Sequence, residues 1–253
     1  MPPEALSFLL VLARVGGALV FVPLPGIRQG PHVARAVLAV SLAVALYPAW
    51  PEPPEQAPDA ARLAAWLLGE AAFGLTAGLA VAFLNESFAL AAQIFGLPAG
   101  YSYAATIDPA TEADSAVLLV MAQFLASLLF FALGLHLEVV RVFAHSFDRW
   151  PPGSFPPGAA RAEGVIALGA SMFSLAMRLA LPVVGLLLLA DVALALLGRI
   201  HSHLQLLMLA FPVKMLGALA MLAAALGLYL KVYREAAGRT VVWLWEVTGG
   251  RGG

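Results

Sequence analysis

Two ionisable side chains of opposite sign interrupt the apolar stretch at residues 181–217. Asp191 precedes the polar turn at residues 199–203, and Lys214 follows it. On two helical arms, a spacing of about a dozen residues places each charge roughly 17 Å from the turn. A lone charge in an apolar helix is costly, so it is normally paired or used. The spacing therefore predicts a buried ion pair between Asp191 and Lys214, which fixes the register of a helical hairpin.

Other polar side chains also fall inside apolar stretches. Glu86 and Gln93 are seven residues apart and share one helix face, which alanines flank. Such a stripe is typical of a packing face between helices, and a pore-lining face is the alternative. A substrate path that uses Arg178 together with the Asp191–Lys214 pair is a second alternative. Apart from that pair, the side chains that we expect to be buried and polar are Arg14, Glu86, Gln93 and Arg178.

The sequence lacks the motifs of the common enzyme classes. It has no cysteine, no phosphate-binding glycine loop, no nucleophile elbow and no His-Glu-x-x-His motif. His201 and His203 lie in a turn without a carboxylate close in sequence, so we expect no metal site. The net charge of −1 gives no basic footprint for nucleic acid. We therefore expect no catalytic residue, no cofactor and no nucleic-acid partner, and we disfavour a membrane enzyme.

The elements that must hold these residues are apolar helices. The 253-residue chain is 62% hydrophobic and 11% charged, with a mean hydropathy of +0.90. A soluble domain of this length could not bury so much apolar surface. The pattern predicts an all-α, polytopic membrane protein whose helices form hairpins in a larger assembly. The six apolar regions span approximately residues 6–23, 33–47, 60–95, 116–143, 165–197 and 204–230.

The lengths of these regions predict how the chain is organised. About twenty residues span a bilayer, yet the third and fifth regions each run past thirty residues. We therefore expect a single domain over residues 1–253, with helices that are partly covered by an assembly. Gly74 and Gly78 have a spacing that lets helix backbones approach closely. Residues 231–253 are predicted to form a short amphipathic tail with two tryptophans at the membrane interface, and a frayed terminus with exposed aromatic side chains is the alternative.

Four segments spread over most of the chain carry a family resemblance. Residues 14–43 contain a proline-rich break, and residues 93–115 contain a glycine-rich entry and an Asp-Pro pair. Residues 128–136 end in Gly-Leu-His, and residues 181–219 contain a proline, an aspartate, an arginine turn and the motif Phe-Pro-x-Lys. In order and spacing these segments resemble the FliR/SctT family, an integral export-gate component of flagellar and virulence type III secretion systems. The leucine between the glycine and the histidine is a departure from the family pattern.

The resemblance implies a function that composition does not show. It implies a non-enzymatic subunit with a structural and gating role in the passage of unfolded substrate proteins across the bacterial inner membrane. The implied partners are FliP/SctR-like and FliQ/SctS-like membrane subunits, a FlhB/SctU-like subunit, the exported proteins and the lipid membrane. The implied location is multi-pass, in the inner membrane at the flagellar basal body. An autonomous multi-span transporter or permease that uses Arg178, Asp191 and Lys214 is the alternative.

The resemblance also implies that a loop after the third apolar region obstructs the channel. This loop, residues 101–115, is too long and irregular to lie in lipid, so it must line a cavity or be covered by protein. Apolar side chains in such a loop can close an aqueous path to ions. A plain surface connector is the alternative interpretation. The predicted plug residues are Tyr101, Tyr103, Ile107, Asp108 and Pro109.

Overall fold

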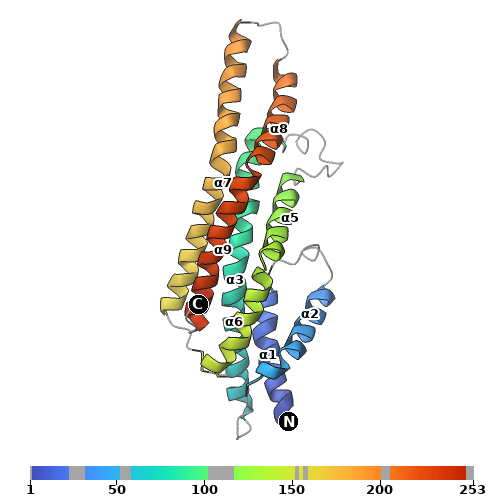
Figure 1. Ribbon diagram of the computed structural model, residues 1–253, viewed down its shortest axis with the longest axis vertical. Helices are drawn as coiled ribbons and strands as arrows, with labels where there is room; N and C mark the ends of the chain where they lie inside the picture. The colour runs from blue at the N-terminus through green and yellow to red at the C-terminus, as the bar shows by residue number, and fades with distance from the viewer. Residues whose placement is uncertain are drawn as a thin grey trace. The chain divides into compact units, whose positions relative to one another are not determined.

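Every regular element in the described part of the chain is a helix (Figure 1). The structure, a computed structural model, describes residues 2–22, 32–51, 58–101, 117–151, 154–155, 159–200 and 206–248. The predicted all-α class is therefore confirmed. The α-helices are α1 (Pro3–Leu19), α2 (His32–Ala45), α3 (Ala60–Ala99), α5 (Val117–Ala132), α6 (Leu135–Arg149), α7 (Ala159–Ile200), α8 (Leu206–Ala224) and α9 (Leu226–Thr248), and a short 3-10 helix, η1, spans Tyr47–Ala49.

Two of the described helices, α3 and α7, are long and apolar enough to cross a membrane. The number of candidate spans in this part of the chain rises to four if the bent pair α5–α6 and the bent pair α8–α9 each count as one span. α3 has 40 residues and α7 has 42, so each is about 60 Å long at ~1.5 Å per residue. The hydrocarbon core of a bilayer is about 30 Å thick. The chain is thus a polytopic membrane protein whose longest helices exceed what a bilayer requires.

Two of the six predicted apolar regions are not single helices. Residues 116–143 break at Gly134, which has a φ of 71° and separates α5 from α6 at a bend of 61°. Glycine adopts this left-handed conformation without the clash that a Cβ would cause. Residues 204–230 break at Ala225, where α8 and α9 meet at 58°. Of the residues expected as an amphipathic C-terminal tail, 231–253, those up to Thr248 belong to α9.

The chain divides into two compact units, which we describe separately. Unit 1 comprises Met1–Leu84, Ser127–Ala170 and Ala236–Gly253. Unit 2 comprises Asn85–Ala126 and Ser171–Glu235. The helices α3, α5, α7 and α9 each contribute one part to each unit.

In unit 1, α1 and the first half of α3 approach each other backbone to backbone. A Cβ added at Gly74 would clash with the carbonyl oxygen of Arg14, and one added at Gly78 would clash with that of Ala18. Small residues allow such close contact between helices in a membrane. The predicted role of the Gly74–Gly78 spacing is confirmed, and the helix that approaches is α1.

In unit 2, two buried tyrosines of α9 join this helix to α3 and α7. The Tyr233 hydroxyl donates to Asn85 Oδ1 of α3 at 2.6 Å, and the Tyr229 hydroxyl donates to the carbonyl oxygen of Leu179 of α7 at 3.2 Å. The ring of Phe88 contacts both, with centroid distances of 5.2 Å to Tyr233 and 6.3 Å to Tyr229. These contacts fix the core of unit 2 around α9.

Candidate functional site

A fully buried arginine of α1 is the centre of a polar cluster in unit 1. Arg14 donates its Nε hydrogen to Glu70 of α3, and both side chains are 0% exposed. Its Nη1 donates to Ser146 Oγ at 2.7 Å, and its Nη2 donates to the carbonyl oxygen of Trp150 at 2.9 Å. One guanidinium therefore joins α1, α3, α6 and the residue that follows α6.

Aromatic rings enclose the same guanidinium. Its central carbon lies 4.6 Å from the ring centroid of Phe73 and 4.3 Å from that of Phe147. The electron-rich faces of aromatic rings stabilise a desolvated cation. A buried ion pair offsets its desolvation only with good geometry and additional hydrogen bonds, and Arg14 has several partners. We conclude that the cluster holds α1 against α3 and α6.

The sequence predicted that Arg14 would be buried, and this is confirmed. It did not predict Glu70 as the partner, because the two residues are 56 positions apart. A signal was nevertheless present. Glu70 lies four residues before Gly74, so both share one face of α3. Gly74 allows close contact with a neighbouring helix, and Glu70 lies one turn away on the same face. This combination indicates that Glu70 faces the neighbouring helix.

The predicted contact between Asp191 and Lys214 is present in unit 2. Lys214 Nζ of α8 donates to Asp191 Oδ1 of α7 at 2.7 Å, although the residues are 23 positions apart. A charge-assisted hydrogen bond of this length is stronger than one between neutral groups. The predicted contact between α7 and α8 is therefore confirmed, and its role in fixing the register of the two helices stays a prediction.

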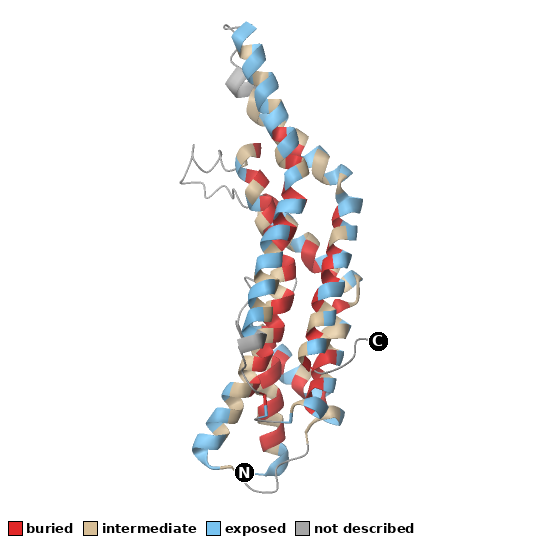
Figure 2. Ribbon diagram, turned by 90° about the vertical axis from the view of Figure 1, so that its left-hand side faces the viewer, coloured by how far each residue is buried: buried red, intermediate tan, exposed pale blue. Residues whose placement is uncertain are grey.

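The same pair is only partly covered by its own chain. The side chain of Lys214 is 11% exposed, whereas that of Asp191 is 48% exposed. The neighbours of Asp191 on α7 are also exposed, with Leu188 at 58%, Leu189 at 70% and Val192 at 57%, and exposed residues dominate the end of this helix (Figure 2). The expectation that Asp191 is buried is thus wrong for the single chain, because this face of α7 is uncovered in the described part of unit 2.

The end of α3 is attached to α8 beside this ion pair. Gly100 has a φ of 90°, and a Cβ there would lie 2.7 Å from Cδ1 of the Phe211 ring. Tyr101 follows, and its hydroxyl donates to the carbonyl oxygen of Met215 at 3.2 Å. Met215 is the neighbour of Lys214 along the chain. The structure thus brings one predicted plug residue, Tyr101, to the stretch of α8 that holds the ion pair.

The other predicted plug residues lie outside the described residues. They are Tyr103, Ile107, Asp108 and Pro109.

Three further polar residues were expected to be buried. Glu86 is half-buried, but Gln93 and Arg178 are exposed. The expected burial of Gln93 and Arg178 is therefore wrong within the single chain, because no described element of that chain covers these two side chains. Arg178 and Asp191 are also thirteen residues apart on α7, which is about 20 Å along a helix. The permease hypothesis needs these two residues and Lys214 at one site, and the structure does not bring all three together.

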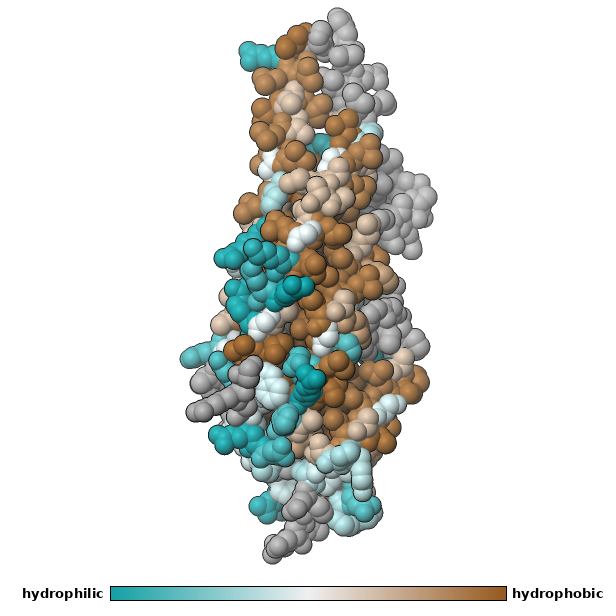
Figure 3. Space-filling model, in the orientation of Figure 1, coloured by the Kyte–Doolittle hydropathy of each residue, from teal (hydrophilic) through white to brown (hydrophobic). Residues whose placement is uncertain are grey.

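The fold and these contacts define a class of protein. It is an all-helical membrane protein in which ion pairs and hydrogen bonds join helices and leave large apolar surfaces uncovered (Figure 3). The described ranges contain no group of three or more histidines or carboxylates that could hold a metal ion. The model of the family described as Bacterial export proteins, family 1, matches residues 5–240, and the chain belongs to that family.

Relatives of known name support the same assignment. The chain is 28% identical over 218 residues to the flagellar biosynthetic protein FliR of Escherichia coli K12, covering 86% of this chain and 83% of that one. It is 27% identical over 240 residues to FliR of Bacillus subtilis 168, covering 93% and 92%. It is also 28% identical over 215 residues to the Yop proteins translocation protein T of Yersinia pestis, covering 83% and 81%. The resemblance to the FliR/SctT family is confirmed.

Proposed function

We propose that this protein is a non-enzymatic subunit of a type III protein-export channel in the bacterial inner membrane. The observation that carries the proposal is the family match over residues 5–240. The relatives named as flagellar biosynthetic proteins and as a Yop translocation protein support it. Both kinds of relative match more than four fifths of the chain, and flagellar and virulence systems share this type of export channel in the proposal.

The proposed partners are FliP/SctR-like, FliQ/SctS-like and FlhB/SctU-like subunits. The support from the structure is the uncovered part of α7. Asp191 is 48% exposed between exposed leucines, and a charge on a lipid-facing surface is costly. α7 is also about twice as long as a bilayer core requires. Both properties fit a helix that packs against other subunits better than one that faces lipid along its whole length.

The proposed gate is the segment that follows α3. Tyr101 anchors the start of this segment to α8 through the carbonyl oxygen of Met215. The next residue of α8 towards its N-terminus is Lys214, which is paired with Asp191. A shift between α7 and α8 would therefore reach the start of the segment directly. In this proposal the segment obstructs the channel at rest and yields to a passing unfolded chain.

An ion-leak measurement tests the gating proposal. Deleting residues 106–113 should raise the leak of ions through membranes that contain the assembled complex, while assembly itself persists. Deleting residues 52–57, in a different connecting segment, is the control and should leave the leak unchanged. An unchanged leak in the first deletion, with normal assembly, contradicts a gate in this segment.

A further inference from the structure

The Asp191–Lys214 ion pair leaves one carboxylate oxygen without a donor in the described part of the chain. Lys214 Nζ donates to Asp191 Oδ1 at 2.7 Å, and no other described residue donates to this carboxylate. A carboxylate can accept about four hydrogen bonds over its two oxygens. Oδ2 of Asp191 is therefore an open acceptor, and it belongs to a side chain that is 48% exposed.

The surface around this acceptor is apolar. Leu188 and Ala195 lie one turn before and one turn after Asp191 on the same face of α7, and both are exposed, Leu188 to 58%. Val213, which is next to Lys214 on α8, is 46% exposed. We name the surface formed by Leu188, Asp191 and Ala195 the Asp191 face. It is an apolar helix face with one open acceptor.

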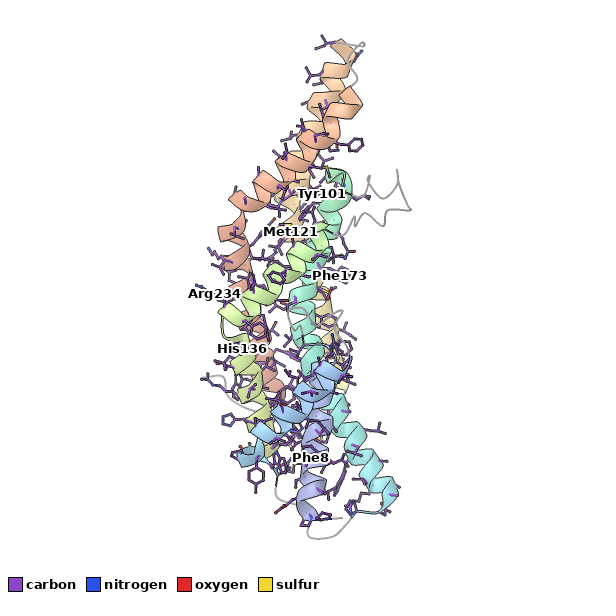
Figure 4. All side chains as sticks on the ribbon, turned by 90° about the vertical axis from the view of Figure 1, so that its right-hand side faces the viewer. Phe8, Tyr101, Met121, His136, Phe173 and Arg234 are labelled. Carbon is purple, nitrogen blue, oxygen red and sulfur yellow. The ribbon has the colours of Figure 1, made fainter. Side chains whose placement is uncertain are left out.

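The hairpin of α7 and α8 continues past the ion pair without another described element beside it. Tyr101, which follows α3, donates to the carbonyl oxygen of the residue after Lys214, and both helices extend well beyond Tyr101 (Figure 4). In this part of α7, Leu196 is 57% exposed, Leu197 is 47% exposed and Ile200 is 72% exposed. A helix that is apolar all round is normally buried, so other molecules must cover this part of α7.

Neither water nor lipid satisfies the Asp191 face. Water would donate to Oδ2, but it would also leave the apolar side chains around Asp191 exposed to solvent, and large exposed apolar surfaces mark interaction sites. Acyl chains would cover the apolar side chains, but they offer no donor to a carboxylate. An apolar helix with one hydrogen-bonding side chain satisfies both the apolar surface and the open acceptor.

The charge of the ion pair decides the chemistry of that side chain. Lys214 already neutralises Asp191, so a second cation would leave one uncompensated charge in an apolar interface. A hydroxyl or a carboxamide adds no charge, and it can both donate and accept a hydrogen bond. Serine, threonine, asparagine and glutamine side chains join helices in membranes in this way.

We propose that the Asp191 face binds an apolar helix of a partner subunit, and that a neutral hydroxyl or carboxamide side chain of this helix donates to Asp191 Oδ2. The proposal rests on the proposed function, because it requires a partner subunit. It adds the chemistry of the contact, which is one neutral polar side chain on an otherwise apolar helix.

Two double variants of the full chain test the proposal through the yield of subunits that co-purify with it. Asp191→Lys/Lys214→Asp exchanges the charges, and Asp191→Leu/Lys214→Met replaces the pair by apolar side chains. A neutral partner group can accept from a lysine as well as donate to an aspartate, so the charge exchange should retain the yield. The apolar pair should reduce the yield about tenfold, because it leaves the partner's polar group buried without a hydrogen bond.

Glu138→Leu/Arg141→Leu is the matched control. It removes an ion pair that joins neighbouring turns of α6, with side chains that are 31% and 64% exposed, and it should leave the yield unchanged. A full yield with the apolar pair overturns the proposal, because it shows that the neighbour of the Asp191 face needs no polar contact. A lost yield with the charge exchange also overturns it, because it shows a charged partner group. A wild-type chain that co-purifies with no subunit contradicts the proposed function instead.

A second measurement covers the case in which the apolar pair impairs folding, which a lower denaturation temperature of the chain alone reveals. The chain has no cysteine, so Ala195→Cys gives a single attachment point for a photoactivatable probe one turn from Asp191. Adducts with a helix of another subunit support the proposal if a serine, threonine, asparagine or glutamine lies within one turn of the modified residue. Adducts with a helix that lacks such a residue, with phospholipid, with a second copy of the chain or with residues 102–116 of the same chain overturn it.

Discussion

Replacing Arg14 by leucine should be one of the most damaging single substitutions in unit 1. The change leaves Glu70, which is 0% exposed, without the guanidinium, and it removes the donors to Ser146 and to the carbonyl of Trp150. Removing one partner of a buried ion pair costs about 3–5 kcal/mol. That is a large fraction of the ~5–15 kcal/mol by which a typical domain is stable. We expect poor accumulation of the variant or a clearly lower denaturation temperature.

The double variant Arg14→Leu/Glu70→Leu distinguishes two causes of instability: the loss of the ion-pair partner of Glu70, and the loss of packing around Arg14. With both charges gone, no buried carboxylate that has lost its guanidinium remains, and an apolar pair of similar volume is often neutral in place of a buried ion pair. The double variant should therefore be more stable than Arg14→Leu alone. Such non-additivity is expected for residues in direct contact.

The assay is heating of the full chain in mild detergent, followed by size-exclusion chromatography of the remaining folded protein. Arg239→Leu is the matched control, because Arg239 is an exposed cation of α9 in unit 1 without an ion-pair partner among the described residues. The control should denature at the wild-type temperature. The reasoning is refuted if Arg14→Leu is no less stable than Arg239→Leu, or if the double variant is less stable than Arg14→Leu.

Three further predictions follow from close contacts. Gly74→Ala should destabilise the chain by about 1–3 kcal/mol through overpacking because its Cβ would clash with a carbonyl oxygen of α1, whereas Gly69→Ala, which meets nothing within 4 Å, should be neutral or stabilising in the same heating assay. Tyr101→Phe removes a hydrogen bond to α8 of about 0.5–1.5 kcal/mol and should raise ion leak without loss of assembly; an unchanged leak counts against the anchor. Asp191→Lys and Lys214→Asp should each reduce the yield of co-purified subunits, because each places two like charges together. The double variant Asp191→Lys/Lys214→Asp, which exchanges the two charges, should restore the yield. A double variant with no restored yield would indicate that a partner subunit contacts the individual charges.

The Asp191–Lys214 contact could be predicted because both residues lie at matched distances from one polar turn. A hairpin brings such positions together regardless of the rest of the fold. The exposure of Asp191 could not be predicted, since its burial depends on which elements cover α7. Hydropathy alone does not distinguish a face that packs in the same chain from one that packs against lipid or another subunit.

The Arg14–Glu70 contact was out of reach for a different reason. The two residues are 56 positions apart. Their helices, α1 and α3, meet through tertiary packing and not because a short turn connects them. The breaks at Gly134 and Ala225 were missed because apolar residues continue across both positions. A glycine within an apolar run was the available signal for the first break, whereas Ala225 carries no local signal of its own.

The central claim is that this 26.4 kDa chain works as one subunit of an export complex in the membrane. The most direct measurement is the native mass of the tagged chain extracted in mild detergent from its own cells, with every co-purified protein identified. We predict a mass several times that of the chain, with small apolar membrane subunits of the export apparatus present in fixed proportion. A chain that purifies alone at 26.4 kDa plus detergent, and that moves a solute unaided in liposomes, would contradict the claim.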